Sequence, residues 1–110
     1  MDEAFIQDLF APFGAVRIRR MFGGLGIYGE DVMFALVADG ELYLKADAEA
    51  AGRFRAAGSQ PFVYEKRGRT MALSYWRLPE MALDDPDELE RWARLAHAAA
   101  LRARAAGKRR

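Results

Sequence analysis

The chain has 110 residues and a formal net charge of +1, and 52% of its residues are hydrophobic. This length is typical of one domain, and this hydrophobic fraction excludes a disordered chain. The chain has no cysteine, which excludes disulfide bonds, thiolate metal sites and cysteine nucleophiles. No apolar run reaches the roughly 18–20 residues of a membrane span, and the acidic N-terminus lacks the basic start of a secretory signal. We therefore expect a cytoplasmic protein that does not associate with a membrane.

The first half of the chain predicts one helix followed by strands. Apolar residues recur at helical spacing after Asp2, which is a good helix cap. Alternation of apolar and polar residues then predicts strands around residues 16–19 and 25–28, and two more strands over 32–38 and 41–45. Residues 32–38 are apolar at every position, so we expect both faces of that strand to be covered.

The second half predicts a helix, a hairpin and a long last helix. Asp47 is a good cap for a helix over residues 47–57, and two strands follow over 61–67 and 70–77. The segment Asp85–Glu88 combines a capping aspartate, a proline in the first helical position and a glutamate that completes a capping box. The element order predicts an α+β fold in which helices pack on one antiparallel sheet.

The basic residues are concentrated at the C-terminus. Residues 86–110 hold seven Lys and Arg against three Asp and Glu, whereas residues 1–85 hold ten against thirteen. A basic tail can reach acidic partners or nucleic acid, although a solvated helix end has the same composition. We expect one domain over residues 1–106 and a frayed basic tail over residues 107–110.

Three glycines, Gly24, Gly26 and Gly29, match the G-x-G-x-x-G spacing of dinucleotide-binding proteins. That motif requires a helix N-terminus directly after the glycines, which receives the pyrophosphate. Here two acidic residues and a strand follow, so we expect no bound nucleotide and no other cofactor. Gly23 and Gly24 instead predict a bend or bulge, and Gly29 predicts a turn with positive φ. Gly26 predicts the close approach of another backbone or of a ring.

Three segments in this order carry a resemblance to a known family: Arg20–Gly24, Leu42–Lys45 and Tyr75–Pro79. Together with the acidic start of the last helix, they make nearly the whole chain resemble the TfoX N-terminal domain family. The resemblance implies a two-layer α/β sandwich with the order α-β(3)-α-β(2)-α, similar to secretion chaperones.

The same resemblance implies a role in natural competence of bacteria. Regulators of this family promote expression of DNA-uptake genes together with the cyclic-AMP receptor protein. The full-length regulators also carry a second, helical domain that does not match this chain. A different partner and pathway, or an accessory domain without a competence role, therefore remain open.

The sequence predicts no catalytic centre. His97 is the one histidine, and it lies in an alanine-rich helix without an obvious carboxylate or serine partner. The pair Asp84 and Asp85 is explained better by helix capping than by a metal ion, because hard cations require more oxygen ligands. We expect a non-enzymatic protein without a metal site.

The sequence suggests two binding surfaces. The first would bind a protein partner such as the transcription machinery, and its expected residues are Arg20, Met21, Phe22, Gly23, Gly24, Trp76, Arg77 and Leu78. An unpaired sheet edge could also form a homodimer. The second would bind nucleic acid weakly and without sequence preference, through Arg91, Arg94, Arg102, Arg104, Lys108, Arg109 and Arg110. For each surface a plainer interpretation stays open: Phe22 and Trp76 as core residues, and the basic residues as solvated charges.

Overall fold

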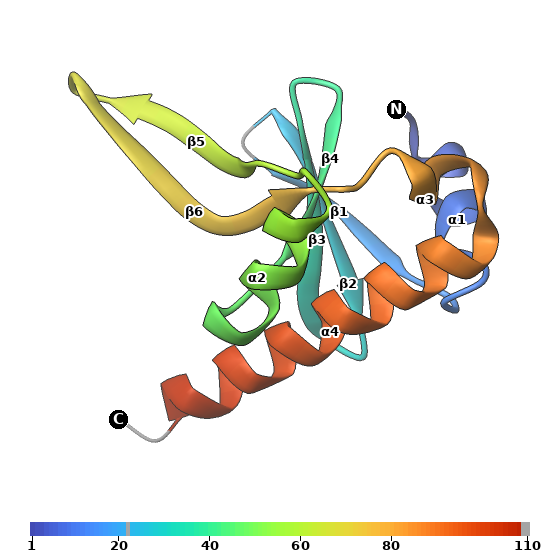
Figure 1. Ribbon diagram of the computed structural model, residues 1–110. Coiled ribbons are helices and arrows are strands. Elements are labelled where there is room, and N and C mark those ends of the chain that lie inside the picture. The colour runs from blue at the N-terminus through green and yellow to red at the C-terminus, as the bar shows by residue number, and fades with distance from the viewer. Residues whose placement is uncertain (22, 109–110) are drawn as a thin grey trace.

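The computed structural model describes residues 1–21 and 23–108, and the side chains of these residues except 64–66, 69–73 and 108. Within this part of the chain the strands form one antiparallel sheet in the order β1-β2-β3-β4-β6-β5. The strands are β1 (Arg17–Met21), β2 (Gly24–Gly29), β3 (Val32–Ala38), β4 (Glu41–Lys45), β5 (Pro61–Lys66) and β6 (Arg69–Arg77). The hairpin of β5 and β6 projects beyond the rest of the sheet (Figure 1).

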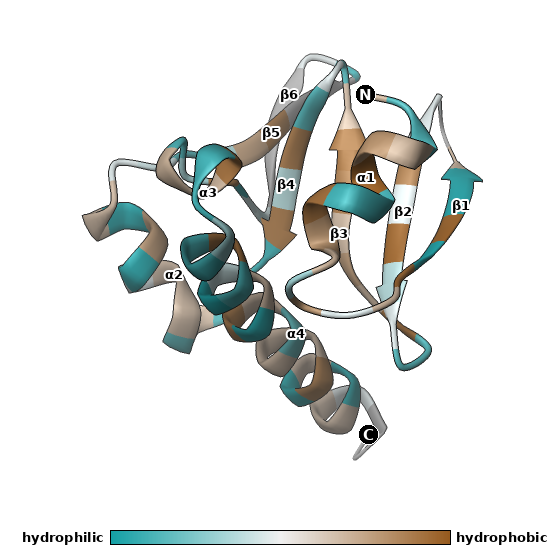
Figure 2. Ribbon diagram, turned by 90° about the vertical axis from the view of Figure 1, so that its right-hand side faces the viewer, coloured by the Kyte–Doolittle hydropathy of each residue, from teal (hydrophilic) through white to brown (hydrophobic). Residues whose placement is uncertain are grey.

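The helices lie on one side of this sheet, in front of the strands in Figure 2. They are α1 (Glu3–Phe10), α2 (Ala48–Ala56), the short α3 (Met81–Asp84) and the long α4 (Pro86–Lys108). Side chains cap three of the helix starts as the sequence predicts. Asp2 accepts a hydrogen bond from the amide of Phe5 at 2.8 Å, and Asp47 accepts one from Ala50 at 2.9 Å. Asp85 accepts from the first turn of α4.

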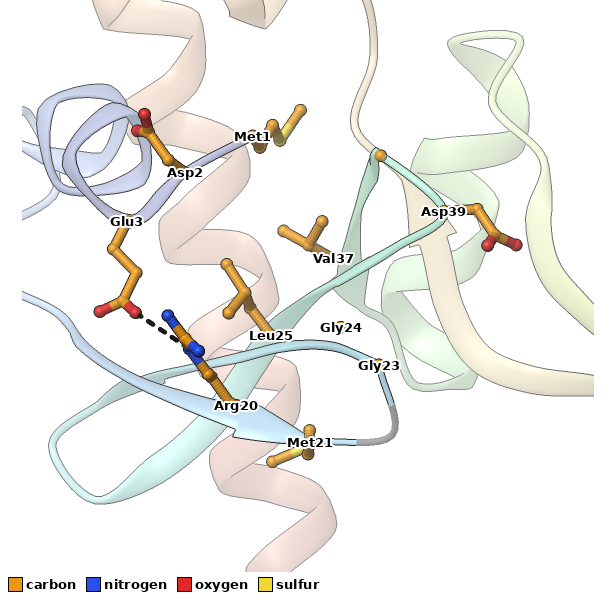
Figure 3. A pocket seen from close by; sticks show the side chains of 11 residues that line it. Met1, Asp2, Glu3, Arg20, Met21, Gly23, Gly24, Leu25, Val37 and Asp39 are labelled. Carbon is orange, nitrogen blue, oxygen red and sulfur yellow. Dashed lines mark ion pairs between the residues drawn. The ribbon is translucent and has the colours of Figure 1, made fainter.

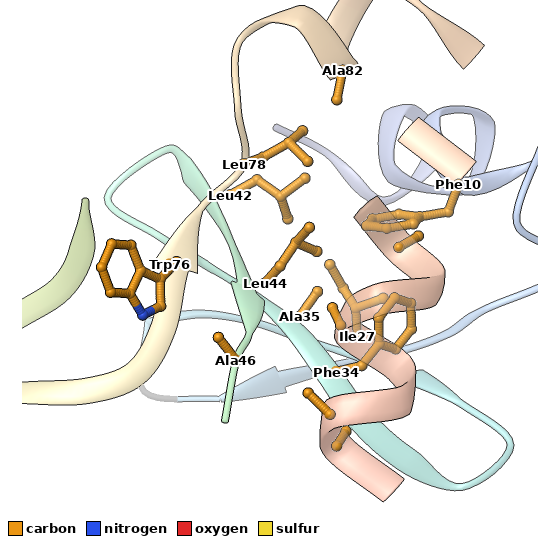
Figure 4. Close-up of a cluster of buried hydrophobic side chains, with 14 of the residues drawn as sticks. Phe10, Ile27, Phe34, Ala35, Leu42, Leu44, Ala46, Trp76, Leu78 and Ala82 are labelled. Carbon is orange, nitrogen blue, oxygen red and sulfur yellow. The ribbon is translucent and has the colours of Figure 1, made fainter. Parts of the chain in front are cut away.

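The hydrophobic core fills the space between the helices and the sheet. Phe34 lies at its centre, with the ring of Phe10 at 5.5 Å and that of Phe13 at 4.9 Å between centroids. Figure 4 shows how Leu44 from β4 and Trp76 from β6 extend this core across the sheet. The alanine-rich face of α4 allows the helix to lie close to the strands, because its small side chains are buried.

The α+β fold class is confirmed, with two differences in detail. Four strands precede α2, as the alternation of residues predicts, whereas the order implied by the family resemblance has three. The short helix α3 was not expected from the sequence. Helix α4 continues through Gly107 to Lys108, so the expected fraying from residue 107 is wrong for the described part of the tail.

A β-bulge in β3 sets which residues face the helices. Ile27 of β2 lies opposite Ala35 and Tyr28 lies opposite Met33, which leaves Phe34 as an extra residue between the two pairs. Because of the bulge, Phe34 and Ala35 both turn toward the helices, and both are fully buried.

The remaining apolar residues of β3 point to the other side of the sheet. Met33 and Leu36 alternate with the core residues and are only half-buried. The helix residues Phe10 of α1 and His97 of α4 pack on the other side of the strand, against Phe34. The expectation that both faces of this strand are covered is therefore wrong, and we call the side opposite the helices the open face.

Candidate partner-binding site

A cleft of about 770 Å³ lies at one end of the sheet, between the start of α1 and the turns β1–β2 and β3–β4 (Figure 3). In an antiparallel meander these two turns fall at the same end of the sheet. Four of the residues expected at a protein-binding surface line the cleft: Arg20, Met21, Gly23 and Gly24. Phe22, expected beside them, lies outside the described residues.

Glycines shape the backbone of this cleft. Gly23 has a φ of +75°, and Gly40 in the facing turn has a φ of +76°. Residues with a side chain rarely adopt these angles. Gly24 is required for space, because a Cβ there would lie 2.0 Å from the carbonyl oxygen of Val37. The expected bend at Gly23 and Gly24 thus has a steric basis in the neighbouring strand.

Two other glycines act differently from the sequence-based expectation. Gly26 does accommodate a close neighbour, but the neighbours are the side chains of Met21 and Met33 and not a backbone or a ring. At the β2–β3 turn the positive φ belongs to Glu30 and Asp31. At Gly29 a Cβ would be in tight contact, 3.2–3.3 Å from two phenylalanine rings and a histidine ring.

The cleft combines an apolar floor with charged walls. Leu25 and Val37 form part of the floor, and Met21 lies at its side (Figure 3). Arg20 and Glu3 form an ion pair at the side of the cleft, with Nε of Arg20 3.7 Å from Oε2 of Glu3. The Arg20 side chain is 87% exposed, so this ion pair contributes little to stability and leaves the guanidinium accessible.

Residues of the cleft from α1 and the β3–β4 turn were not predicted from the sequence. They are Met1, Asp2, Glu3 and Asp39. A signal for them exists, because the hairpin signals at residues 23–24 and 39–40 place two turns at one sheet end. The position of α1 over that end depends on packing that a single sequence does not reveal.

The second half of the expected protein-binding surface lies elsewhere. Trp76 is 8% exposed and Leu78 is 4% exposed, and both belong to the core (Figure 4). Arg77 is exposed, but β6 is separated from β1 by three strands. The structure therefore does not bring the two halves together, and the burial of Trp76 and Leu78 matches the core interpretation.

Most of the described arginines expected to bind nucleic acid are paired with carboxylates. On α4, Arg91 contacts Glu88, and Arg94 contacts Glu90 at 2.9 Å. Arg104 is exposed and has no ion pair among the described side chains. The side chain of Lys108, together with Arg109 and Arg110, lies outside the description.

Arg102 binds to the start of α2. Its guanidinium donates to Asp47 at 2.6 Å and lies 2.9 Å from Glu49. The hydrogen bond from Arg102, with the smaller contribution of the Ala50 amide, lowers the pKa of Asp47 although burial opposes the shift. The same hydrogen bond raises the pKa of Arg102. This arginine therefore joins two helices, which reduces the positive charge that it offers to a ligand.

His97 has a structural environment. Its side chain is 8% exposed and its Nε2 lies 2.9 Å from the carbonyl oxygen of Gly29, an arrangement in which Nε2 donates. The ring packs edge-on against Phe13 and Phe34.

Within the described part of the chain no group of three or more His, Asp and Glu residues could hold a metal ion. No described helix is both long and apolar enough to span a membrane.

A match to a family model shows which protein family the chain belongs to. The family model for the TfoX N-terminal domain matches residues 8–100. The chain belongs to this family. The matched residues run from α1 into α4 and include every strand of the sheet.

Two relatives place the TfoX N-terminal domain in longer proteins. The chain is 36% identical to the DNA transformation protein TfoX1 of Aliivibrio fischeri over 89 residues, which are 81% of this chain and 42% of the relative. It is 32% identical to the protein Sxy of Escherichia coli over 96 residues, which are 87% of this chain and 46% of the relative. The chain thus spans less than half the length of each of these relatives.

Proposed function

We propose that the chain is a non-enzymatic regulatory domain that contributes to the control of DNA-uptake gene expression by binding a protein partner. The observation that carries this proposal is the family match over residues 8–100, together with a relative that is named for DNA transformation. Transcription machinery is the partner class that fits such control.

The cleft beside Arg20–Gly24 is the proposed contact site for the partner. It supports the proposal because it offers an apolar floor, an accessible arginine and backbone turns fixed by glycines, as protein-binding sites commonly do. Trp76 and Leu78 are not included, since a partner could not reach them without opening the core. Nucleic-acid binding through α4 has less support, because Arg91, Arg94 and Arg102 are paired with carboxylates.

A chimeric protein tests the proposal. The segment of the Aliivibrio fischeri TfoX1 that matches this chain would be replaced by residues 8–100, and the frequency of DNA transformation would be measured. We expect the chimera to support transformation at a frequency well above that of a strain that lacks the gene. A chimera that is produced in normal amounts and folded, yet no better than the strain without the gene, would contradict the proposal.

A further inference from the structure

The open face of the sheet carries aromatic and apolar residues in register across the strands. One row crosses five strands, from β1 to β6, and consists of Arg19, Gly26, Leu36, Tyr43 and Arg77. A neighbouring row begins with Arg17, Tyr28 and Met33. Four strand spacings of about 4.8 Å make the first row about 19 Å long. At Gly26 the side chains of Met21 and Met33 fill the space that a side chain would take.

Aromatic rings dominate this face. Tyr43 on β4 packs against Phe62 on β5 with ring centroids 4.8 Å apart. The guanidinium of Arg17 lies 4.8 Å from the ring centroid of Tyr28, and the ammonium of Lys45 lies 5.2 Å from that of Tyr75. Each of these rings is half-buried and keeps part of its surface exposed.

Two further tyrosines belong to the same face. The strand register places Tyr28 opposite Met33 and Tyr75 opposite Lys45. Partial burial raises the pKa of the Tyr75 hydroxyl to about 12, with a smaller contribution from Tyr28. Tyr28, Tyr43 and Tyr75 therefore stand on β2, β4 and β6, on one side of the sheet.

Among the side chains that the structure describes, cations outnumber carboxylates around these rings. Arg17, Arg19, Lys45 and Arg77 belong to the face, and Arg19 has no ion pair among the described side chains. Two carboxylates lie at its ends: Asp31 is 3.6 Å from Arg17 and Glu41 is 3.7 Å from Arg77. All four of these paired side chains are about half exposed or more, so solvent screens the pairs and the cations remain available.

We propose that the open face binds single-stranded nucleic acid, with bases stacked on Tyr28, Tyr43 and Tyr75 and phosphates held by Arg17, Arg19 and Arg77. Flat rings in a row with cations beside them are the combination that single strands require, because every base has a π-face and every phosphate a negative charge. A duplex hides its base faces and could meet only the cations.

Charge also favours this ligand over a second copy of the chain. Two open faces placed against each other would bring together twice as many described cations as carboxylates, which is unfavourable. An apolar protein surface would leave the same cations without partners. This inference concerns a different surface from the cleft, since Arg19 points to the open face while Arg20 stands on the side of Glu3. It does not depend on the proposed function.

Fluorescence anisotropy with a labelled oligo-dT tests the proposal on the full chain over a series of salt concentrations. We expect binding that weakens as salt rises and that an unlabelled duplex displaces poorly. Arg19→Glu should weaken binding at least about tenfold and reduce the slope of log affinity against log salt by about 0.7 or more. The matched control is Arg53→Glu on α2, which reverses an exposed arginine outside both basic surfaces and should leave binding unchanged. Arg104→Glu compares the open face with the basic residues of α4.

A second variant separates stacking from charge. Tyr43→Leu keeps an apolar side chain but removes the ring, and it should weaken oligo-dT binding about tenfold without changing the salt slope. Thermal unfolding establishes that each variant is folded. The proposal is overturned if the unmodified chain does not bind oligo-dT at about 100 mM salt, as expected if the face serves a protein or a second copy. It is also overturned if Arg104→Glu weakens binding as much as Arg19→Glu does, or if duplex competes equally well.

Discussion

At the scale of single residues, the candidate cleft depends on two adjacent glycines with different requirements. Gly23 supplies a positive φ that allows β1 to turn back into β2. Gly24 supplies the absence of a side chain, because β3 passes directly beside it. A sequence shows that a glycine pair is present, but it does not show which of the two is limited by conformation and which by space.

Gly24→Ala should therefore destabilise the protein. The added methyl group would lie 2.0 Å from a main-chain oxygen of Val37, and the backbone of a strand paired on both sides cannot move aside cheaply. We expect the free energy of unfolding, measured with urea, to fall by about 2–3 kcal/mol. Gly52→Ala is the control, because Gly52 lies in α2 with open space around its Cβ position. It should be neutral or stabilising by up to about 1 kcal/mol, and an equal loss in both variants would contradict the steric explanation.

At the scale of elements, Asp47 connects α2 to α4. One side chain caps α2 through the amide of Ala50 and also accepts from Arg102 of α4. The cap is predictable, since an aspartate directly before a run of helix-forming residues is a local signal. The pair with Arg102 is not, because the two residues are 55 positions apart and meet only through the packing of the helices.

Substitutions of Asp47 should separate these two roles. Asn at this position keeps a capping oxygen but loses the charged partner of Arg102, so Asp47→Asn should lower the free energy of unfolding by about 0.5–1 kcal/mol. Asp47→Ala loses both interactions and should cost about 1 kcal/mol more. Glu49→Gln serves as the control, because the Glu49 side chain is 73% exposed and its contact with Arg102 should contribute little. If Asn and Ala are equally destabilising, the capping role is refuted.

The stabilisation from the Asp47–Arg102 interaction should disappear in acid. Because the folded state lowers the pKa of Asp47 from its ordinary value of 3.8, the carboxylate stabilises the fold above that value. The contribution is lost as the pH falls below 3.8 and through the lowered pKa. Urea unfolding at several pH values should therefore show a difference between the original protein and Asp47→Asn that is full near pH 7 and shrinks toward about pH 2. A difference that stays constant over this range would contradict the assignment.

At the scale of the whole molecule, the helices divide the sheet into a core face and an open face. The sequence predicts the order of elements, most of their bounds and three helix caps, since these depend on neighbouring residues. It does not predict which side of each strand is buried, because the bulge at Phe34 changes the alternation within β3. Alternation in β6 does not show which of its sides faces the helices, so the sequence allowed Trp76 to be proposed as a contact residue. Its position opposite Leu44 places it in the core.

The candidate site was predictable only in part, for the same physical reason. Arg19 and Arg20 precede a pair of glycines, and charged residues beside a turn are exposed in most packings. Whether Trp76 joined that surface depended on strand order, and β2, β3 and β4 lie between the two segments. The sequence also did not predict that Asp47, at the start of α2, pairs with Arg102 of α4.

The most direct test of the account is the DNA transformation frequency of the TfoX1 chimera carrying Arg20→Glu. The substitution reverses an accessible charge at the cleft and disturbs only a weak ion pair, so the domain should remain folded. Arg53→Glu, at an exposed position on α2, provides the matched control. With equal protein amounts, we predict that Arg20→Glu lowers the frequency at least about tenfold while Arg53→Glu leaves it unchanged. Equal frequencies for Arg20→Glu and the unmodified chimera would contradict the assignment of the cleft as the partner-binding site.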